Sequence, residues 1–178
     1  GQMEKATFGA GCFWGVEDKF RNTRGVKSTM VGYTGGHTKD ATYEQVCSDT
    51  TGHAEAVEVE FDPAVVSYDK LLELFFSLHD ATQLNRQGPD EGTQYRSAVF
   101  CHSDDQRRIA EGRKKALDAS GAFGAPIVTE IVPFTKFWPA EDYHKDYFAR
   151  NPDQGYCRAI IRPKMEKFRK AFAEKLKK

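Results

Sequence analysis

A cysteine followed by two large aromatic residues is the part of this sequence best suited to chemistry. Cys12 lies between Gly11 and the pair Phe13-Trp14, after a short alternating apolar run and at the start of a segment with helical spacing. Backbone N–H groups and the positive end of a helix dipole favour the thiolate at such a turn, and the thiolate is the nucleophile. We therefore predict that Cys12 attacks a small, weakly polar group beside Phe13 and Trp14. The alternative is a buried core cysteine.

A carboxyl group with a shifted pKa is the second predicted feature. Glu55 lies in the alternating run 54–61 at the same parity as Val57 and Val59, whereas Glu58 points to the other face. A carboxyl on an apolar face loses hydration, so its pKa rises. A proton retained near neutral pH is what a general acid requires. The alternative places Glu55 at an exposed strand end.

The elements that would position these residues are both helical and extended. Alternating and buried runs predict strands at 4–10, 26–33, 54–61, 94–101 and 127–134. Helical periodicity and caps predict helices at 12–22, after Ser67, from Ser103 to about 119, after Pro139 and from Pro163. Polar loops are expected at 34–53 and 80–93. Helices and strands without strict alternation indicate an α+β fold with a mainly antiparallel or mixed sheet.

Composition bounds the class of protein. The 178 residues are 39% hydrophobic and 29% charged, with no net charge, which is typical of one globular domain, taken here as residues 1–178. A balanced charge gives no field to attract nucleic acid. No apolar run approaches the roughly 20 residues of a membrane span, and no signal peptide is visible. We expect a cytoplasmic monomer that binds neither nucleic acid nor membrane.

The cysteines indicate redox chemistry rather than a scaffold. The four cysteines are far apart, with no CxxC pair, and the five histidines are scattered. A disulfide framework or a structural zinc site normally uses closer spacing. A catalytic thiol in a reducing compartment fits better, with no metal and no cofactor.

Five blocks of sequence resemble the A-type peptide methionine sulfoxide reductases. The blocks occur in family order along nearly the whole chain, so the probability of a chance resemblance is very small. They are Gly11–Trp14; Gly32–Gly36; Thr42–Cys47 with Thr51–Glu55; Asn85–Gly88 with Asp90–Ser97; and Phe137–His144 with Asn151–Cys157.

The resemblance implies a fold, a reaction and site residues. The fold would be a two-layer α/β sandwich of ferredoxin-like character. The activity would be reduction of the S epimer of free and peptide-bound methionine sulfoxide. Phe13 and Trp14 would hold the methyl group, and Tyr43 and Tyr95 would donate hydrogen bonds to the sulfoxide oxygen alongside Glu55. Asp90 would hold the substrate backbone or a site water, although its loop could be only a turn.

Recycling of the thiol is the step with an open alternative. Methionine would leave a sulfenic acid on Cys12, which a second thiol can convert to a disulfide. Cys157 matches the recycling cysteine of the family, and thioredoxin would then reduce the Cys12–Cys157 disulfide. Cys157 could instead be a buried thiol before a short strand at 159–161, and Cys47 is the backup. Cys101 ends an apolar strand and is expected to be inert.

Two other functions fit parts of the pattern. In a thiol peroxidase, Cys12 would attack peroxide, and the aromatic niche would be unnecessary. A Cys/His metal-binding module would be non-catalytic and would carry stoichiometric zinc.

Overall fold

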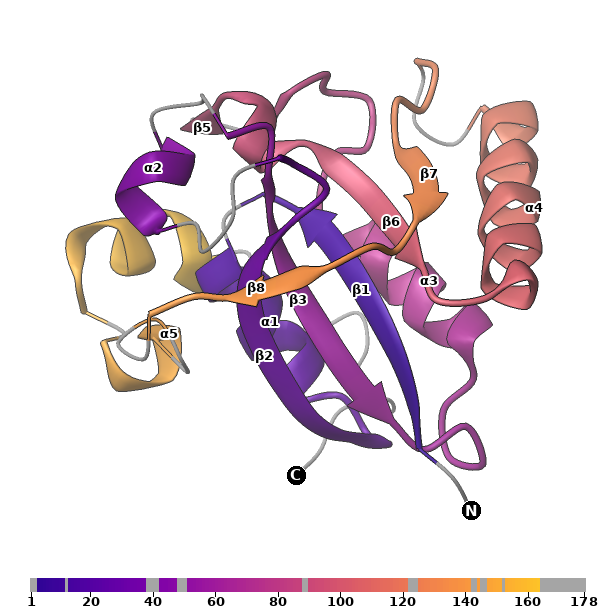
Figure 1. Cartoon of the computed structure of the whole chain (residues 1–178), viewed down its shortest axis with the longest axis horizontal. Coiled ribbons are helices and arrows are strands. Elements are labelled where there is room, and N and C mark those ends of the chain that lie inside the picture. The colour runs from indigo at the N-terminus through magenta and orange to yellow at the C-terminus, as the bar shows by residue number, and fades with distance from the viewer. Residues whose placement is uncertain are drawn as a thin grey trace.

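A six-stranded sheet with helices packed against it is the frame of the molecule (Figure 1). The computed structural model describes residues 3–11, 13–37, 42–47, 51–87, 90–121, 125–141, 144, 147–151 and 153–163. Its main elements are β1 (Glu4–Ala10), α1 (Phe13–Arg21), β2 (Val26–Thr34), β3 (Ala54–Phe61), α3 (Tyr68–Leu78) and β6 (Ser97–Cys101). The peripheral elements are α2 (Tyr43–Cys47), β4 (Arg86–Gln87), β5 (Asp90–Glu91), α4 (Asp104–Ser120), β7 (Glu130–Pro133), β8 (Phe137–Pro139) and α5 (Tyr147–Arg150).

The strand order confirms the predicted α+β, ferredoxin-like fold. The sheet runs β7-β6-β1-β3-β2-β8. Its four central strands are antiparallel to one another, and with α1 and α3 they form the β-α-β-β-α-β arrangement. At the edges, β7 pairs parallel to β6, and β8 pairs antiparallel to β2. The sheet is therefore mixed, as expected.

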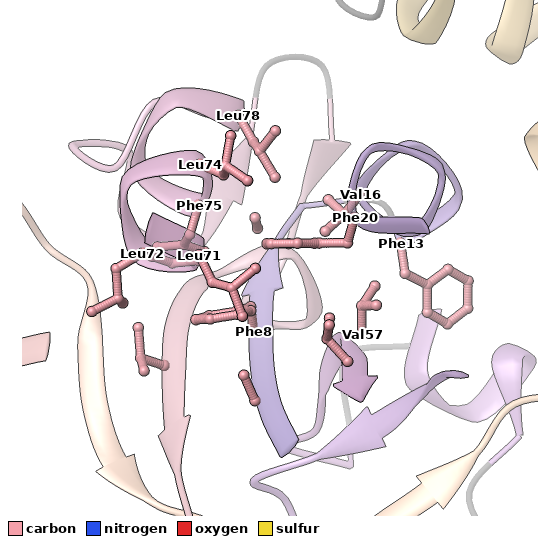
Figure 2. Packing of buried hydrophobic residues seen from close by; sticks show 14 of the residues in the cluster. Phe8, Phe13, Val16, Phe20, Val57, Leu71, Leu72, Leu74, Phe75 and Leu78 are labelled. Atoms are coloured by element: carbon pink, nitrogen blue, oxygen red, sulfur yellow. The ribbon is translucent and has the colours of Figure 1, made fainter. Parts of the chain in front are cut away.

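The main core lies between one face of the sheet and helices α1 and α3. Figure 2 shows Phe8 of β1 between Phe20 of α1 and Phe75 of α3. The Phe8 ring lies 5.2 Å from the ring of Phe20 and 5.1 Å from that of Phe75. Burial of these rings removes apolar area from water and fixes both helices on the sheet. The start of α1 is thereby fixed next to the end of β1.

A smaller cluster covers the opposite face. Ala56 of β3 and Phe100 of β6 are buried there, with Phe134 and Phe137 packed against them. The strand ends near Ala54 and Ser97 are consequently buried on both faces. A side chain there is shielded from water whichever way it points.

The predicted helix caps are confirmed. Ser67 accepts a hydrogen bond from the Lys70 amide, and Ser103 accepts one from the Gln106 amide. Helix α4 ends at Gly121, whose φ of 69° is the left-handed conformation that favours glycine. None of the described helices is both long and apolar enough to cross a membrane.

Four expectations about elements are corrected. The loop expected at 34–53 contains the short helix α2, and the strand expected at 127–134 is shortened to β7. The strand considered at 159–161 is helical instead, because Cys157–Ile161 forms a π-helical turn in which the Arg162 amide bonds to the Cys157 carbonyl. A three-residue apolar run does not distinguish strand from helix. This helix already contains the residues before Pro163, so it does not begin there.

Candidate active site

The turn between β1 and α1 is where the predicted nucleophile falls. Strand β1 ends at Ala10 and α1 begins at Phe13, while Cys12 itself lies outside the described residues. Gly11 has a φ of 91°, and a Cβ atom there would lie 2.9 Å from Cγ of Gln87. Only glycine fits this backbone without strain. Its tight packing fixes the direction in which the chain enters α1.

Glu55 is buried beside this turn. Only 1% of it is exposed, so its predicted location on the buried face of the strand is confirmed. Its Oε1 accepts a hydrogen bond from the backbone amide of Phe13 at 3.2 Å. Its other oxygen, Oε2, is buried and has no hydrogen-bond partner among the described residues. A carboxyl oxygen next to the residue that follows Cys12 is therefore available for a proton or a ligand.

Burial raises the pKa of Glu55 from its ordinary value of 4.5 to about 8. Hydrogen bonds from the Phe13 amide and the Tyr95 side chain oppose this rise, whereas the negative charge of Asp90 adds to it. The side chain is thus a neutral acid over most of the physiological pH range. Phe13, Tyr95 and Asp90, which all act on this pKa, belong to the predicted site.

Six aromatic rings form a cluster around Trp14. We call this the aromatic cluster; its members are Phe13, Trp14, Tyr43, His144, Tyr147 and Tyr156. Tyr147 of α5 stacks on Trp14 at 4.1 Å, and the ring of Tyr43 lies 6.2 Å from Phe13. Phe13 is fully buried, whereas Trp14 is half-buried. The cluster therefore joins the core to the surface next to the turn.

A carboxylate holds Tyr43 at the start of α2. Both oxygens of Glu141 accept from the Tyr43 amide at 3.2 Å, and Oε1 also accepts from the Tyr33 hydroxyl at 3.1 Å. A negative charge at the first amides of a helix stabilises it. Sequence reasoning missed this helix, although Thr42 and Gln45 form a capping box that predicts it.

Tyr156 connects Asp90 to the aromatic cluster, and the sequence did not single it out. Its hydroxyl donates a hydrogen bond to Oδ2 of Asp90, and its ring lies edge-on to Trp14 at 6.0 Å. Asp90 belongs to β5, far from Tyr156 in sequence. The residue immediately before Cys157 therefore contacts two of the predicted substrate-binding residues.

The two candidate recycling cysteines occupy different surroundings. Cys157 is fully buried in the π-helical turn, and burial raises the pKa of its thiol. Four residues on, Ile161 packs closely against Gly15 of α1. Cys47 ends α2, and its side chain lies outside the described residues. The choice between them stays a prediction.

The surroundings of Cys101 support the expectation that it is inert. Cys101 ends β6 and is buried, and burial raises the pKa of its thiol to about 11. Such a thiol stays protonated and weakly nucleophilic at neutral pH. Among the residues that the structure describes, no three His, Cys, Asp or Glu are grouped as metal ligands.

Comparison with known proteins agrees with this arrangement. A model of the peptide methionine sulfoxide reductase family matches residues 4–176. The peptide methionine sulfoxide reductase MsrA of Natronomonas pharaonis is 53% identical over 171 residues, which cover 96% of each chain.

Solved structures show the same similarity. Reduced Mxr1 of Saccharomyces cerevisiae is 35% identical with a TM-score of 0.82, over 88% of this chain and 90% of that one. Mxr1 in complex with Trx2 is 25% identical with a TM-score of 0.58, over 82% of this chain and 85% of that one. Since both the sequence and the fold match over most of their lengths, the chain belongs to the peptide methionine sulfoxide reductase family.

Proposed function

We propose that this chain reduces the S epimer of methionine sulfoxide, free or peptide-bound, and that thioredoxin restores its thiols. The observation that carries the proposal is the buried carboxyl of Glu55, which accepts from the Phe13 amide directly after Cys12. The relatives named above are reductases of this substrate class, and Mxr1 forms a complex with Trx2. The chain is thus a thiol-dependent oxidoreductase.

The first step joins a thiolate, a proton and the sulfoxide. The thiolate of Cys12 attacks the sulfoxide sulfur while Glu55 gives its proton to the sulfoxide oxygen. The bond between the two sulfurs then breaks as the protonated oxygen passes to the Cys12 sulfur, so Cys12 becomes a sulfenic acid and methionine leaves as the reduced thioether. Without that proton, an oxide-like group would carry the developing charge. A pKa of about 8 keeps Glu55 protonated for this purpose at neutral pH.

Substrate orientation follows from the groups around Glu55. The side chain of Tyr95 lies close enough to Glu55 to lower its pKa, and Tyr43 belongs to the aromatic cluster, so both phenols could donate to the sulfoxide oxygen. Phe13 and Trp14 form the methyl niche at the edge of the core. Asp90 holds the substrate backbone. Selection between epimers requires the methyl group to contact Phe13 and Trp14 while the oxygen accepts from the phenols and Glu55, an arrangement that only one configuration at sulfur satisfies.

The second step uses Cys157. Its thiol attacks the sulfenic acid sulfur, so a disulfide forms and water leaves. Thioredoxin then transfers two electrons by thiol–disulfide exchange and is itself oxidised. Cys157 is supported by its place directly after Tyr156, which contacts Trp14 and Asp90. Because its thiol is fully buried, the π-helical turn has to open before attack.

The proposal also covers the domain organisation, oligomeric state, location and partners of the enzyme. We propose one catalytic domain over residues 1–178, acting as a cytoplasmic monomer without cofactor, metal, nucleic acid or membrane partners. The wide spacing of the four cysteines, without a CxxC pair, supports a reducing compartment. The zero net charge supports the expected lack of nucleic-acid binding.

The aromatic niche separates sulfoxide reduction from peroxide chemistry. In Trp14→Ala, the rate of sulfoxide reduction should fall by at least about tenfold, because the substrate methyl loses its apolar wall. Trp138→Ala is the matched control, because it removes the same side chain from strand β8, and Trp138 is not a member of the aromatic cluster. Both variants are assayed with capped methionine sulfoxide and with hydrogen peroxide. An enzyme that consumes peroxide faster than sulfoxide and keeps its activity in Trp14→Ala would be a thiol peroxidase. Metal analysis of the purified protein tests the other alternative, because stoichiometric zinc would favour the metal-binding module.

A further inference from the structure

His144 lies fully buried at the centre of the aromatic cluster. Its ring is 4.5 Å from Tyr43, 5.2 Å from Phe13 and 5.9 Å from Trp14. Those three residues come from α1 and α2, which are separated by strand β2. A single imidazole therefore contacts three of the side chains proposed to surround the substrate.

One hydrogen bond determines which nitrogen of this imidazole carries the proton. The Trp14 indole Nε1–H donates to Nδ1 of His144 at 2.9 Å. An indole nitrogen can only donate, so Nδ1 must be an unprotonated acceptor. The proton of the neutral ring is consequently on Nε2.

We infer that His144 is a positioning residue, a neutral Nε2–H imidazole whose Nδ1 holds the Trp14 indole in place as a wall of the methyl niche. The inference rests on the proposed function for the identity of that niche. Its hydrogen bond and tautomer are properties of the folded protein and can be measured without substrate.

Stacking alone would leave the Trp14 ring free to turn. The ring lies against Tyr147 at 4.1 Å and Tyr43 at 6.3 Å, but stacked rings can slide or rotate in their planes at small cost. A hydrogen bond has a preferred direction and fixes the indole edge. Because Trp14 is only half-buried, core packing does not impose that direction by itself.

The surroundings of the ring favour the neutral form. The ionisable groups that the structure places around His144 are the carboxylate of Glu141 and the phenols of Tyr43 and Tyr147. Burial lowers the pKa of His144, and Glu141 opposes this only in part. A protonated ring would carry hydrogen on Nδ1 and set it against the indole N–H, so the bond would be lost.

Two variants whose new side chains have equal shape distinguish the role of His144 as a hydrogen-bond acceptor from its role in packing. In His144→Asn the amide oxygen occupies the place of Nδ1 and can accept the indole hydrogen, whereas His144→Leu has the same shape without an acceptor. We expect KM for capped methionine sulfoxide to rise about tenfold more in the Leu variant than in the Asn variant, because one hydrogen bond is lost. The rate of the reductive step at saturating substrate should change less than KM, since the niche binds the methyl group and does not transfer the proton.

Nuclear magnetic resonance tests the bond directly in the unaltered protein. The Nδ1 resonance of His144 should be that of an unprotonated nitrogen and the Nε2 resonance that of a protonated one. The indole N–H signal of Trp14 should move in the Leu variant more than in the Asn variant, with Trp138 as internal reference, because the chain has two tryptophans. A proton on Nδ1, or equal indole shifts and equal KM values in the two variants, would overturn the inference. If the tautomer and shifts are as expected but no sulfoxide is reduced, the proposed function fails and the hydrogen-bond assignment stands.

Discussion

The carboxyl Oε1 of Glu55 accepts a hydrogen bond from the backbone amide of Phe13 at 3.2 Å. This bond connects β3 to the first residue of α1 and brings a buried acid next to the residue that follows Cys12. Phe13 thus binds the acid through its backbone amide and contributes its aromatic side chain to the methyl niche. Proton donor and methyl niche are consequently fixed relative to each other before substrate binds.

Glu55→Gln should slow the reductive step by about 10²- to 10⁴-fold, the usual contribution of a general acid. The amide keeps the shape and can still accept from Phe13, so the fold should be retained. Single-turnover formation of methionine from capped methionine sulfoxide measures the step without recycling. Glu58→Gln is the matched control on the same strand, where Glu58 pairs with Lys5 at 3.6 Å. Equal rates in the two variants would exclude Glu55 as the acid.

The buried acid should also make stability depend on pH. The pKa of Glu55 is 4.5 ordinarily and about 8 in the folded chain, so between these pH values the folded state retains a proton that the unfolded state loses. The free energy of unfolding should therefore fall by up to about 1.4 kcal/mol per pH unit as the pH rises across this window. Urea titrations from pH 4 to 9 on the wild type and Glu55→Gln isolate this contribution as a difference. Parallel stability curves for the two proteins would contradict the raised pKa.

Cys157→Ser should separate reduction from recycling. The first methionine should form at the wild-type rate, because Cys12 and Glu55 are untouched, but turnover with thioredoxin should stop after it. Peptide mapping after one turnover should show a Cys12–Cys157 disulfide in the wild type. Cys47→Ser is the control and should turn over normally. A Cys12–Cys47 disulfide, or full thioredoxin turnover in Cys157→Ser, would assign recycling to Cys47.

Tyr156→Phe removes the hydroxyl that donates to Asp90 but keeps the ring edge-on to Trp14. We expect KM to rise by up to about tenfold, because Asp90 loses a partner that fixes its orientation. Tyr147→Phe is the matched control, since its ring stacks on Trp14 and the stack remains. The finding that would count against this role of Tyr156 is an equal change in both variants.

Much of the fold follows from local patterns in the sequence. Alternation in β3 and the caps at Ser67 and Ser103 are short-range signals, and the structure contains each of them. The position of Glu55 on the buried face was predictable by parity, because every second residue of a strand shares a face. The ferredoxin-like topology depended on family resemblance, since spacing does not specify strand order.

The parts that sequence did not predict depend on contacts between distant segments. Tyr156 lies 66 residues from Asp90, and the Trp14 indole reaches His144 130 residues away. No local pattern specifies such pairs. Helix α2 is different, because its Thr42–Gln45 capping box was present in the sequence and was obscured by the surrounding Gly, Thr and Asp residues. The π-helical turn at Cys157 ends at Ile161, two residues before Pro163, whose ring nitrogen cannot donate a hydrogen bond.

Chiral chromatography of racemic capped methionine sulfoxide tests the central claim most directly. The protein is reduced with dithiothreitol and incubated with the racemate, and the remaining epimers are quantified. The account predicts loss of the S epimer, appearance of an equal amount of methionine and an unchanged R epimer. Survival of both epimers, or equal loss of both, would contradict it.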